Sequence, residues 1–226
     1  VTDYIRALDR SGYFETVTLS EDDLKRNDMY RANAQRAKAQ SRFADYHDYL
    51  LSLEMTAEIG DFSPLYLQRI TQLTNKSNQF NLTTKRYTAE QMEAVYNSDE
   101  YIRLYGKLYD KFGDNGVVAV TIGKTDSEDK GRLDIELWLM SCRVLKRDME
   151  LAMLDSLVAQ AKKRGIREIY GHYYPTAKNK MVAGLYESFG FEKISQDEEG
   201  NTAWRLMVEG YEDKNTVIKV KEEHYA

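Results

Sequence analysis

The chain has 226 residues, a formal net charge of −5 and 42% hydrophobic residues, enough for the core of one medium-sized domain and an additional segment. Its 32 Lys and Arg against 37 Asp and Glu lack the basic excess that is typical of proteins binding nucleic acid or anionic membranes. One cysteine, Cys142, excludes an intramolecular disulfide and a zinc site of several thiolates. We therefore expect a cytoplasmic protein with no metal, no nucleic-acid partner and no membrane partner.

The first 53 residues predict a helical arm or connector. Ser20 is a suitable N-cap before "EDDLKRNDMYRANAQRAKAQSRF", where acidic residues fall in the first turn, and "DYHDYLLSL" predicts a second helix.

From residue 54 to residue 140 the pattern indicates one strand, two helices and three further strands. "MTAEIGDF" predicts a short strand. "SPLYLQRITQLTNKSN", with Ser63 as cap and Pro64 in the first turn, predicts a helix, as does "TAEQMEAVYNS". Alternation in "EYIRLYGKLYDKF" and "RLDIELWLM" predicts strands on either side of the apolar "VVAVTIG", with a turn at "GDNG", residues 113 to 116.

The remaining segments alternate between helix and strand. A helix is predicted from about 148 to 164, ended by Gly165, and "REIYGHYY" predicts a strand. "TAKNKMVAGLYESF" predicts a helix capped by Thr176, "GFEKI" and "TAWRLMV" a hairpin, and "NTVIKV" one more strand in the tail. We divide the chain into an arm (1–53), one domain (54–210) and a tail (211–226).

This order of elements resembles the GCN5-related N-acetyltransferase (GNAT) fold, in which "NKMVAGLYESFGFEKI" matches the closing helix and strand. Several separated motifs are similar to the C-terminal region of FkbH-like proteins (HAD superfamily, subfamily IIIC). They are "GYFETVTLSEDDLKRNDMYRANAQR", "LTNKSNQFNLTTKRY", "FGDNG", "LMSCRVLKRD" and "PTAKNKMVAGLYESFGF", and they span nearly the whole chain.

The resemblance implies an α/β fold of the GNAT type, with a mixed central sheet flanked by helices. FkbH-like proteins usually carry a HAD-type phosphatase domain in the same longer chain and are associated with polyketide biosynthesis. They take a glyceryl unit from a phosphorylated glycerate and load it on the phosphopantetheine thiol of an acyl carrier protein. The phosphatase motif "DxDxT" does not occur in this sequence, so the resemblance implies acyl transfer without phosphatase chemistry. The alternative is a catalytically degenerate GNAT fold that binds a carrier protein for a phosphatase domain.

The loop after the third central strand is the expected anion site. In GNAT domains an Arg/Gln-x-x-Gly-x-Gly/Ala turn and the next helix N-terminus hold the pyrophosphate of coenzyme A. Here Arg143 fits, but Lys146 and Asp148 replace the glycines, so we expect a carrier protein's phosphopantetheine arm, with coenzyme A as the less favoured alternative. Asp148 is also interpreted as an ordinary helix cap. The candidate cofactor-binding residues are Arg143, Val144, Lys146, Arg147 and Asn179.

Four residues are catalytic candidates, each with a structural alternative. Cys142 is a candidate thioester relay or a small buried hydrophobe. Tyr186 matches the tyrosine that protonates the leaving thiolate in many GNAT enzymes, or is a core tyrosine with a bonded hydroxyl. Glu136 is a candidate general base or an ion-paired residue, and His172 a candidate base or a packed side chain. The polar loops supply the substrate-binding candidates Asn78, Gln79, Asn81, Thr83, Asp114 and Asn115, which follow from the family resemblance.

Overall fold

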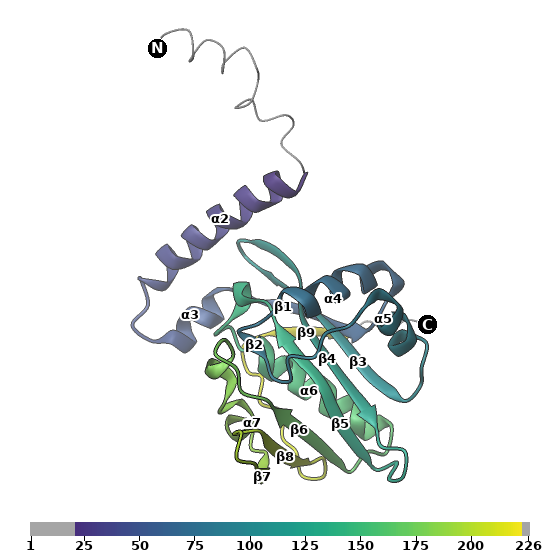
Figure 1. The fold of residues 1–226 in the computed structure, drawn as a ribbon. Helices are drawn as coiled ribbons and strands as arrows, with labels where there is room; N and C mark the ends of the chain where they lie inside the picture. The colour runs from purple at the N-terminus through teal and green to yellow at the C-terminus, as the bar shows by residue number, and fades with distance from the viewer. Residues whose placement is uncertain (1–20, 223–226) are drawn as a thin grey trace, which may run out of the picture. The chain divides into compact units, whose positions relative to one another are not determined.

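A computed structural model describes residues 21–222, shown in Figure 1; the predicted cap Ser20 lies outside the described residues. The chain divides after Ala44 into two compact units. The first contains α2 (Glu21–Gln40), a helix as the sequence predicts. The second begins at Asp45 and contains every other described helix and strand. Within residues 21–222, no helix combines the length and the apolar character needed to cross a lipid bilayer.

The second unit is built on a mixed sheet of nine strands. They are β1 (Thr56–Asp61), β2 (Phe80–Asn81), β3 (Tyr101–Asp110), β4 (Gly113–Thr125), β5 (Arg132–Met140), β6 (Glu168–Tyr173), β7 (Glu192–Gln196), β8 (Thr202–Met207) and β9 (Lys219–Glu222). The strand order is β7-β8-β6-β5-β4-β3-β1-β9, and β2 pairs with β5 beside this path. The predicted central strands and the closing hairpin are confirmed. The turn predicted at residues 113 to 116 is wrong in position, because Gly113 already pairs with Asp110 and begins β4.

The helices are α3 (Tyr46–Ser52), α4 (Pro64–Lys76), α5 (Ala89–Tyr96), α6 (Met149–Lys163) and α7 (Leu185–Ser188), with short 3-10 turns η1 (Cys142–Val144) and η2 (Lys180–Val182). Pro64 occupies the first turn of α4 as predicted, although the Ser63 side chain makes no capping bond. Thr88 and Gln91 form a reciprocal capping box that starts α5. Local sequence therefore determines where these two helices begin.

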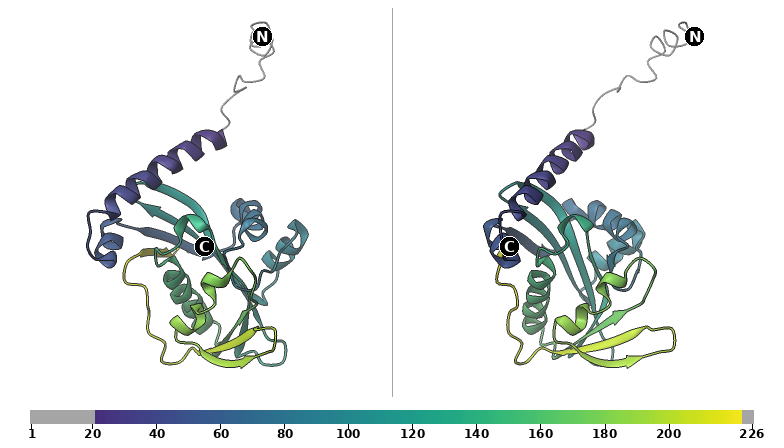
Figure 2. Two further views of the ribbon diagram at one scale, coloured as in Figure 1. Left: turned by 60° about the vertical axis from the view of Figure 1, so that its left-hand side comes forward. Right: turned by 90° about the vertical axis from the view of Figure 1, so that its left-hand side faces the viewer.

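Helices cover both faces of the sheet, as Figure 2 shows. Tyr105 of β3 packs in a core cluster with Ile70 of α4 and Met92 of α5. The next residue, Gly106, points the other way, because a Cβ there would lie 2.3 Å from Met149 Cε in α6. Successive strand residues point to opposite faces, so α4 and α5 cover one face and α6 covers the other.

The parallel strands β5 and β6 pair over only three residues, Arg132–Asp134 with Glu168–Tyr170. Beyond this point the chain's own β2 segment lies between them. The Leu82 amide donates to the Trp138 carbonyl at 3.1 Å, and the Tyr174 amide donates to the Leu82 carbonyl at 2.9 Å. Open α/β sheets commonly bind ligands beside the carboxyl ends of parallel strands. In this chain backbone fills that position between β5 and β6.

The continuous helix predicted after Thr176 is wrong. The segment instead forms η2 and the four-residue α7, separated at Ala183 and Gly184. The Thr176 amide and hydroxyl both donate to Asn179 Oδ1, at 2.7 and 3.0 Å. Asn179 Nδ2 donates to the carbonyls of Asn81 and Tyr174, both at 2.9 Å. These long-range bonds hold residues 176–179 as a turn, which overrides the helical periodicity of the local sequence.

The tail returns to the sheet as β9, parallel to β1, so the predicted additional strand forms. Its path is held by Asp155 of α6. The Asp155 carboxylate accepts bonds from the Tyr211 hydroxyl at 2.6 Å and from the amides of Lys214 at 3.0 Å and Asn215 at 2.8 Å. One half-buried carboxylate thus fixes the segment that leads into the last described strand.

Candidate functional site

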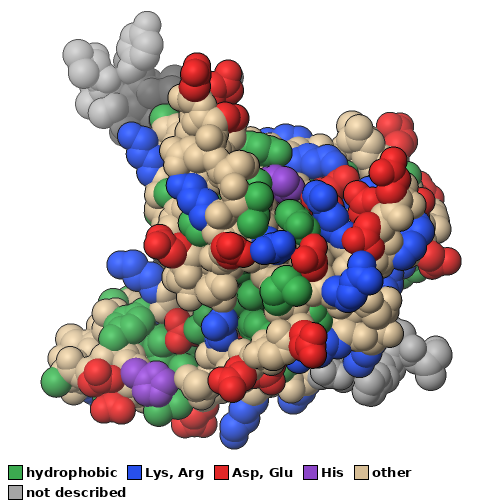
Figure 3. Space-filling view, turned by 90° about the horizontal axis from the view of Figure 1, so that it is seen from below, with side chains coloured by type: hydrophobic (Ala, Val, Ile, Leu, Met, Phe, Trp, Pro, Cys, Tyr) green, Lys and Arg blue, Asp and Glu red, His purple; other side chains and the backbone are tan. Residues whose placement is uncertain are grey.

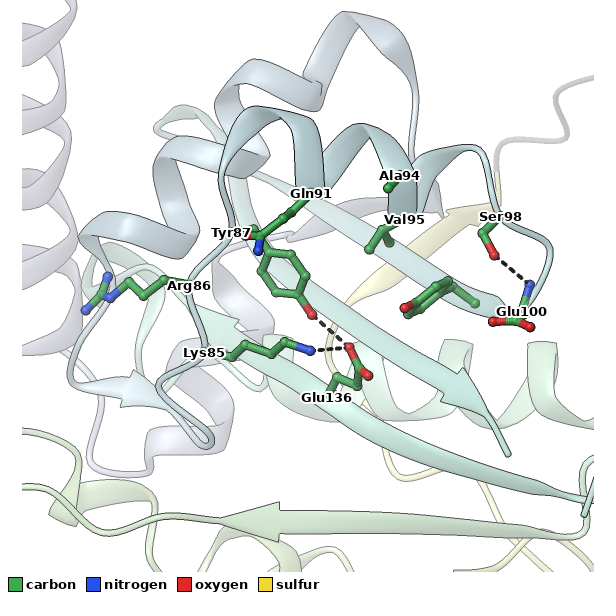
Figure 4. A pocket seen from close by; sticks show the side chains of 10 residues that line it. Lys85, Arg86, Tyr87, Gln91, Ala94, Val95, Ser98, Glu100 and Glu136 are labelled. Carbon is green, nitrogen blue, oxygen red and sulfur yellow. Dashed lines mark hydrogen bonds and ion pairs between the residues drawn. The ribbon is translucent and has the colours of Figure 1, made fainter. Parts of the chain in front are cut away.

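An open groove of about 430 Å³ lies on the α5 side of the sheet. Figure 4 shows its walls, formed by the segment before α5, by α5 itself, and by the strands β3 and β5. The lining includes Lys85, Tyr87, Gln91, Tyr101 and Glu136. Of the residues singled out from the sequence, Glu136 alone is part of this lining.

A β-bulge places Glu136 in the groove. Ile122 of β4 pairs with Leu137, whereas the next residue, Gly123, pairs with Ile135. Glu136 is therefore an extra residue on β5, and such bulges re-aim side chains and occur often beside active sites. Its side chain is 23% exposed.

Two donors hold the Glu136 carboxylate. The Tyr87 hydroxyl donates to Oε2 at 3.0 Å, and Lys85 Nζ forms an ion pair with the same oxygen. Burial raises the pKa of the Tyr87 hydroxyl, and the Glu136 charge raises it further. Tyr87 consequently keeps its proton and acts as a donor. The Lys85 side chain is 43% exposed, with Nζ 5.0 Å from the centre of the Tyr87 ring.

The other end of the groove carries a similar set of groups. Lys124 Nζ lies 5.5 Å from the centre of the Tyr101 ring and 3.6 Å from the Glu100 carboxylate. Figure 4 shows Glu100 at the opposite end of the groove from Lys85. Here the ion pair is longer and Glu100 is 57% exposed, so its carboxylate is held less firmly than that of Glu136.

The loop after β5 has a left-handed backbone at Lys146 and Asp148, the two residues that stand where the GNAT turn has glycines. Lys146 has φ +63° and Asp148 has φ +59°. A non-glycine residue in this conformation costs about 1 kcal/mol. The Tyr46 hydroxyl, which donates to the Lys146 carbonyl at 2.6 Å, helps to hold the loop in place.

Arg147 holds the same loop from the inside. Its Nη1 lies 3.0 Å from Asp110 Oδ2 and 3.4 Å from Asn115 Oδ1, and its Nη2 donates to the Arg143 carbonyl at 2.9 Å. The Asp110 side chain is fully buried and that of Arg147 is 10% exposed. The Arg147 charge is therefore directed into the protein rather than toward a ligand at the surface of the loop.

The start of α6 is acidic. Asp148 makes no capping bond with its side chain, so its interpretation as an ordinary helix cap is wrong: the left-handed backbone accompanies a carboxylate that does not cap the helix. Burial raises the pKa of Asp148. Burial also raises the pKa of Glu150 to about 7, and the Asp148 charge adds to this rise. Glu150 Oε2 is buried and has no hydrogen-bond partner among the described residues.

The N-terminus of α6 is where a GNAT domain would bind the diphosphate of coenzyme A. A diphosphate at the α6 N-terminus would lie close to two carboxyl groups, while the Arg147 guanidinium is bonded to Asp110. Phosphate binding at a helix N-terminus needs free amides and a positive local field. The residues present do not fit the diphosphate of coenzyme A in this position. Arg143 remains at the surface of the loop, with Nε 3.3 Å from Ser141 Oγ.

Cys142 begins η1 and is exposed, so the alternative of a small buried hydrophobe is wrong. It is not part of the groove lining. Glu136 and Met140 are separated by four strand steps, about 13 Å, and Cys142 lies two residues further on. The thiol and the Glu136 carboxylate therefore belong to different places on the surface.

Tyr186 lies in the core and is fully buried. Its ring packs over Gly171, where a Cβ would lie 2.3 Å from Tyr186 Cε1, and it meets Trp138 edge-on at a centroid distance of 6.5 Å. Burial raises the pKa of its hydroxyl. That hydroxyl has no hydrogen-bond partner within residues 21–222, so Tyr186 is a core tyrosine without the bonded hydroxyl that the sequence suggested.

Tyr186 and the groove lie on opposite faces of the sheet. Trp138 pairs with Thr121, whose neighbours Val120 and Ile122 face the core cluster under α4 and α5. Alternation along β5 directs Trp138 to the other face. Tyr186 packs against Trp138 and therefore lies on that face as well. The structure thus does not bring Tyr186 and Glu136 together.

His172 and Asn179 are both engaged within the protein. His172 Nε2 lies 3.3 Å from Asp134 Oδ1, and its ring stacks on Tyr174 with centroids 6.2 Å apart. Asn179 is fully buried and uses its side-chain amide in the turn described above. Val144 is fully buried as well.

None of the predicted substrate-binding residues lines the groove. Asn81 and Thr83 are buried, and Thr83 Oγ1 donates to the Glu136 carbonyl at 2.8 Å, so this segment positions the strand that carries Glu136. Asn115 belongs to the Arg147 cluster. Asn78 accepts a bond from Arg86, Asp114 accepts one from the Gly116 amide, and Gln79 is exposed.

Lys85 and Tyr87 are not among the site residues predicted from the sequence, although both belong to the stretch "LTNKSNQFNLTTKRY". Their spacing of two residues, in an extended segment just before the cap of α5, was the available signal. What connects them to Glu136 is a contact across about 50 residues of chain, which no local pattern reveals.

Comparison with known proteins finds no matching family model and no matching curated protein. Solved structures do match. The ribosomal-protein-S18-alanine N-acetyltransferase from Escherichia coli has a TM-score of 0.51 at 14% identity, covering 71% of this chain and 99% of its own. A GNAT-family acetyltransferase from Streptococcus pneumoniae has a TM-score of 0.52 at 17% identity, covering 67% and 99%. The yncA protein from Salmonella typhimurium, solved with its cofactor acetyl-CoA, has a TM-score of 0.51 at 14% identity, covering 70% and 96%.

The second unit therefore has the fold of GNAT acetyltransferases, with a central mixed sheet flanked by helices, as the sequence predicts.

Proposed function

We propose that this chain is the acyltransfer region of an FkbH-like protein. It moves a small acyl unit, glyceryl or similar, to the phosphopantetheine thiol of an acyl carrier protein. The observation that carries the proposal is the Glu136 carboxylate, which a β-bulge directs into an open groove between two hydrogen-bond donors. The identity of the acyl unit and of the carrier-protein partner is taken from the motifs that resemble those of FkbH-like proteins.

The groove contains the groups that acyl transfer to a thiol needs. Glu136 takes the proton of the acceptor thiol as its sulfur attacks the acyl carbonyl carbon. A carbon–sulfur bond forms, and negative charge develops on the carbonyl oxygen, where the Lys85 ammonium and the Tyr87 hydroxyl act as donors. The bond to the donor's leaving group then breaks, and that group takes up the proton. Both donors already point into the groove at Glu136.

A phosphopantetheine arm suits this chain better than coenzyme A. The arm carries one phosphodiester, whereas coenzyme A brings a diphosphate and a further phosphate to the start of α6. Asp148 and Glu150 lie at that position, and Arg147 is bonded to Asp110. Arg143 and Lys146, on the surface of the loop, are sufficient for a single phosphate.

Cys142 has a separate place in this proposal. Its exposed thiol at the end of β5 takes the acyl unit as a thioester, and the donor's leaving group departs with the thiol proton. The phosphopantetheine thiol of the carrier protein then attacks this thioester and releases the Cys142 thiol, on a route outside the groove that does not use Glu136. If so, incubation of the longer protein with a phosphoglycerate donor leaves an acyl mass on this segment, and Cys142→Ala abolishes that mass. Acylation that persists in Cys142→Ala removes the relay from the mechanism.

A second function is a carrier-protein-binding module without catalysis of its own, serving a phosphatase domain. The observation that favours it is the Lys85–Glu136 ion pair, which satisfies the carboxylate within the protein. Such a module predicts carrier-protein binding that persists when Glu136 is changed.

One experiment separates the two. The chain is mixed with S-acetyl-N-acetylcysteamine and a carrier protein bearing phosphopantetheine, and the carrier protein's intact mass is followed with time. Glu136→Gln should slow acyl loading about 100-fold, since a positioned general base contributes roughly that much or more. Glu93→Gln, an exposed residue of α5 outside the groove lining, is the matched control. Equal rates for Glu136→Gln, Glu93→Gln and the unchanged chain would refute the catalytic proposal.

A further inference from the structure

We infer that Lys85 is a site of self-acylation, at which its ε-amino group accepts the acyl unit from a thioester bound in the groove. The inference deepens the proposed function and rests on it, because it needs an acyl donor in the groove and Glu136 as base. It concerns regulation of the same site.

The geometry of Lys85 is that of a nucleophile beside its base. Nζ forms a hydrogen-bonded ion pair with Glu136 Oε2, and a nucleophile within hydrogen-bond reach of a base is the arrangement that covalent catalysis uses. The side chain is 43% exposed and lines the groove. Figure 4 shows the Lys85 and Glu136 side chains pointing toward each other, so an acyl carbonyl that approaches Glu136 also approaches Nζ.

The reaction balances without a further reagent. Glu136 accepts one proton from the Lys85 ammonium, and the neutral amine attacks the carbonyl carbon of the thioester. A carbon–nitrogen bond forms and the carbon–sulfur bond breaks. The leaving thiolate takes the second nitrogen proton, and Glu136 returns the first to solvent. The products are an amide on Lys85, a free thiol and one proton.

The modification changes the groove in two ways. The amide has no positive charge, so the ion pair with Glu136 is lost and the carboxylate keeps the Tyr87 hydroxyl as donor at 3.0 Å. The acyl chain also occupies part of the groove of about 430 Å³. Transfer to a carrier-protein thiol requires the Lys85 ammonium as a donor and space in the groove for the acyl unit. Acylation of Lys85 removes both, so it switches the site off.

Lys124 provides a matched comparison within the same molecule. Its side chain is 42% exposed, it sits over a tyrosine ring, and it pairs with a carboxylate, Glu100. Lys124 differs in that its nitrogen lies 3.6 Å from a mostly exposed carboxylate and the residue does not line the groove. Reaction governed by accessibility alone labels both lysines equally, whereas reaction assisted by Glu136 favours Lys85.

The test incubates the full 226-residue chain with S-acetyl-N-acetylcysteamine and measures acetylation of each lysine by peptide mass spectrometry over time. Lys85 should react at least about tenfold faster than Lys124, since a positioned base contributes roughly 100-fold or more. Glu136→Gln should reduce the Lys85 rate to that of Lys124. Lys85→Arg, which keeps the positive charge, should yield no adduct at residue 85 and leave the Lys124 rate unchanged.

Equal rates at Lys85 and Lys124, or a Lys85 rate that is unaffected by Glu136→Gln, overturn the inference. Loading of a carrier-protein thiol is measured in the same mixture to keep the two ideas distinct. Glu136-dependent loading without preferential Lys85 acetylation rejects self-acylation and leaves the proposed function standing. Preferential, Glu136-dependent acetylation of Lys85 without loading supports the lysine site and rejects the thiol acceptor.

Discussion

The buried pair of Asp110 and Arg147 should be the most sensitive point of the loop after β5. The Asp110 side chain has no exposed surface, and its Oδ2 lies 3.0 Å from Arg147 Nη1. Asp110 Oδ1 also accepts the Phe112 amide at 2.8 Å. Asp110→Asn keeps the size of the side chain and removes its charge, which leaves the Arg147 guanidinium buried without its anionic partner.

The expected cost follows from the burial of the pair. Removing one partner of a buried ion pair costs about 3–5 kcal/mol. Arg147 keeps its bonds to the Arg143 carbonyl and to Asn115, so we expect the lower end, about 3 kcal/mol. For a folded unit of this size that corresponds to a fall in Tm of roughly 6–12 °C.

Urea unfolding followed by tryptophan fluorescence measures this loss, because both tryptophans, Trp138 and Trp204, are buried in the same unit. The matched control is Asp114→Asn in the neighbouring hairpin, where the carboxylate is exposed and accepts the Gly116 amide. The control should cost less than about 1 kcal/mol.

The reasoning fails if Asp110→Asn costs no more than Asp114→Asn. A double variant offers a further check, since replacing both partners of a buried pair by apolar groups is often neutral. Asp110→Leu combined with Arg147→Met should recover most of the stability that Asp110→Asn loses. A double variant less stable than Asp110→Asn would contradict the assignment of the loss to an unpaired charge.

Three further predictions concern the loop after β5, the start of α6 and the tail. Lys146→Gly and Asp148→Gly should each stabilise the chain by up to about 1 kcal/mol in urea unfolding, because both residues have φ near +60°, whereas alanine at either position should give no gain. Asp155→Ala should speed amide hydrogen exchange in residues 217–222 by at least about tenfold, since it removes the acceptor for the Tyr211 hydroxyl and two backbone amides; unchanged protection would show that the tail is held otherwise. Burial raises the Glu150 pKa to about 7 from its ordinary value of 4.5, so stability should be full below about pH 4.5, fall by roughly 3 kcal/mol as the pH rises from there to about 7, and change little above that. Glu150→Gln should abolish that fall in Tm measurements between about pH 5 and 8, and a variant with the same pH profile as the unchanged chain would reject it.

The surface of the second unit gives little guidance to function, as the composition suggests. Figure 3 shows acidic and basic side chains interspersed on the face that it presents. The near balance of 32 basic and 37 acidic residues is consistent with this mixture. Individual groups in the groove, rather than a charged surface, carry the proposed chemistry.

Local sequence patterns are sufficient to predict the order and type of most elements, because strand alternation, helix caps and turn residues act over a few neighbouring positions. They indicate the sheet that carries Glu136, the anion loop and the extra strand in the tail. The break in the helix after Thr176 was not visible, since it depends on bonds from Asn179 to Asn81, nearly 100 residues away.

The composition of the site depends on contacts between segments that are far apart in the sequence. The bulge at Glu136 arises from pairing with β4, and Lys85 and Tyr87 meet its carboxylate across the sheet. Tyr186 matched a family motif, yet alternation along β5 directs its neighbour Trp138 away from the groove. Candidate site residues that look equally suitable in the sequence thus lie in different places in the structure. The sheet face to which a side chain points, and whether it is buried, depend on which strands pair, and long-range contacts set that pairing.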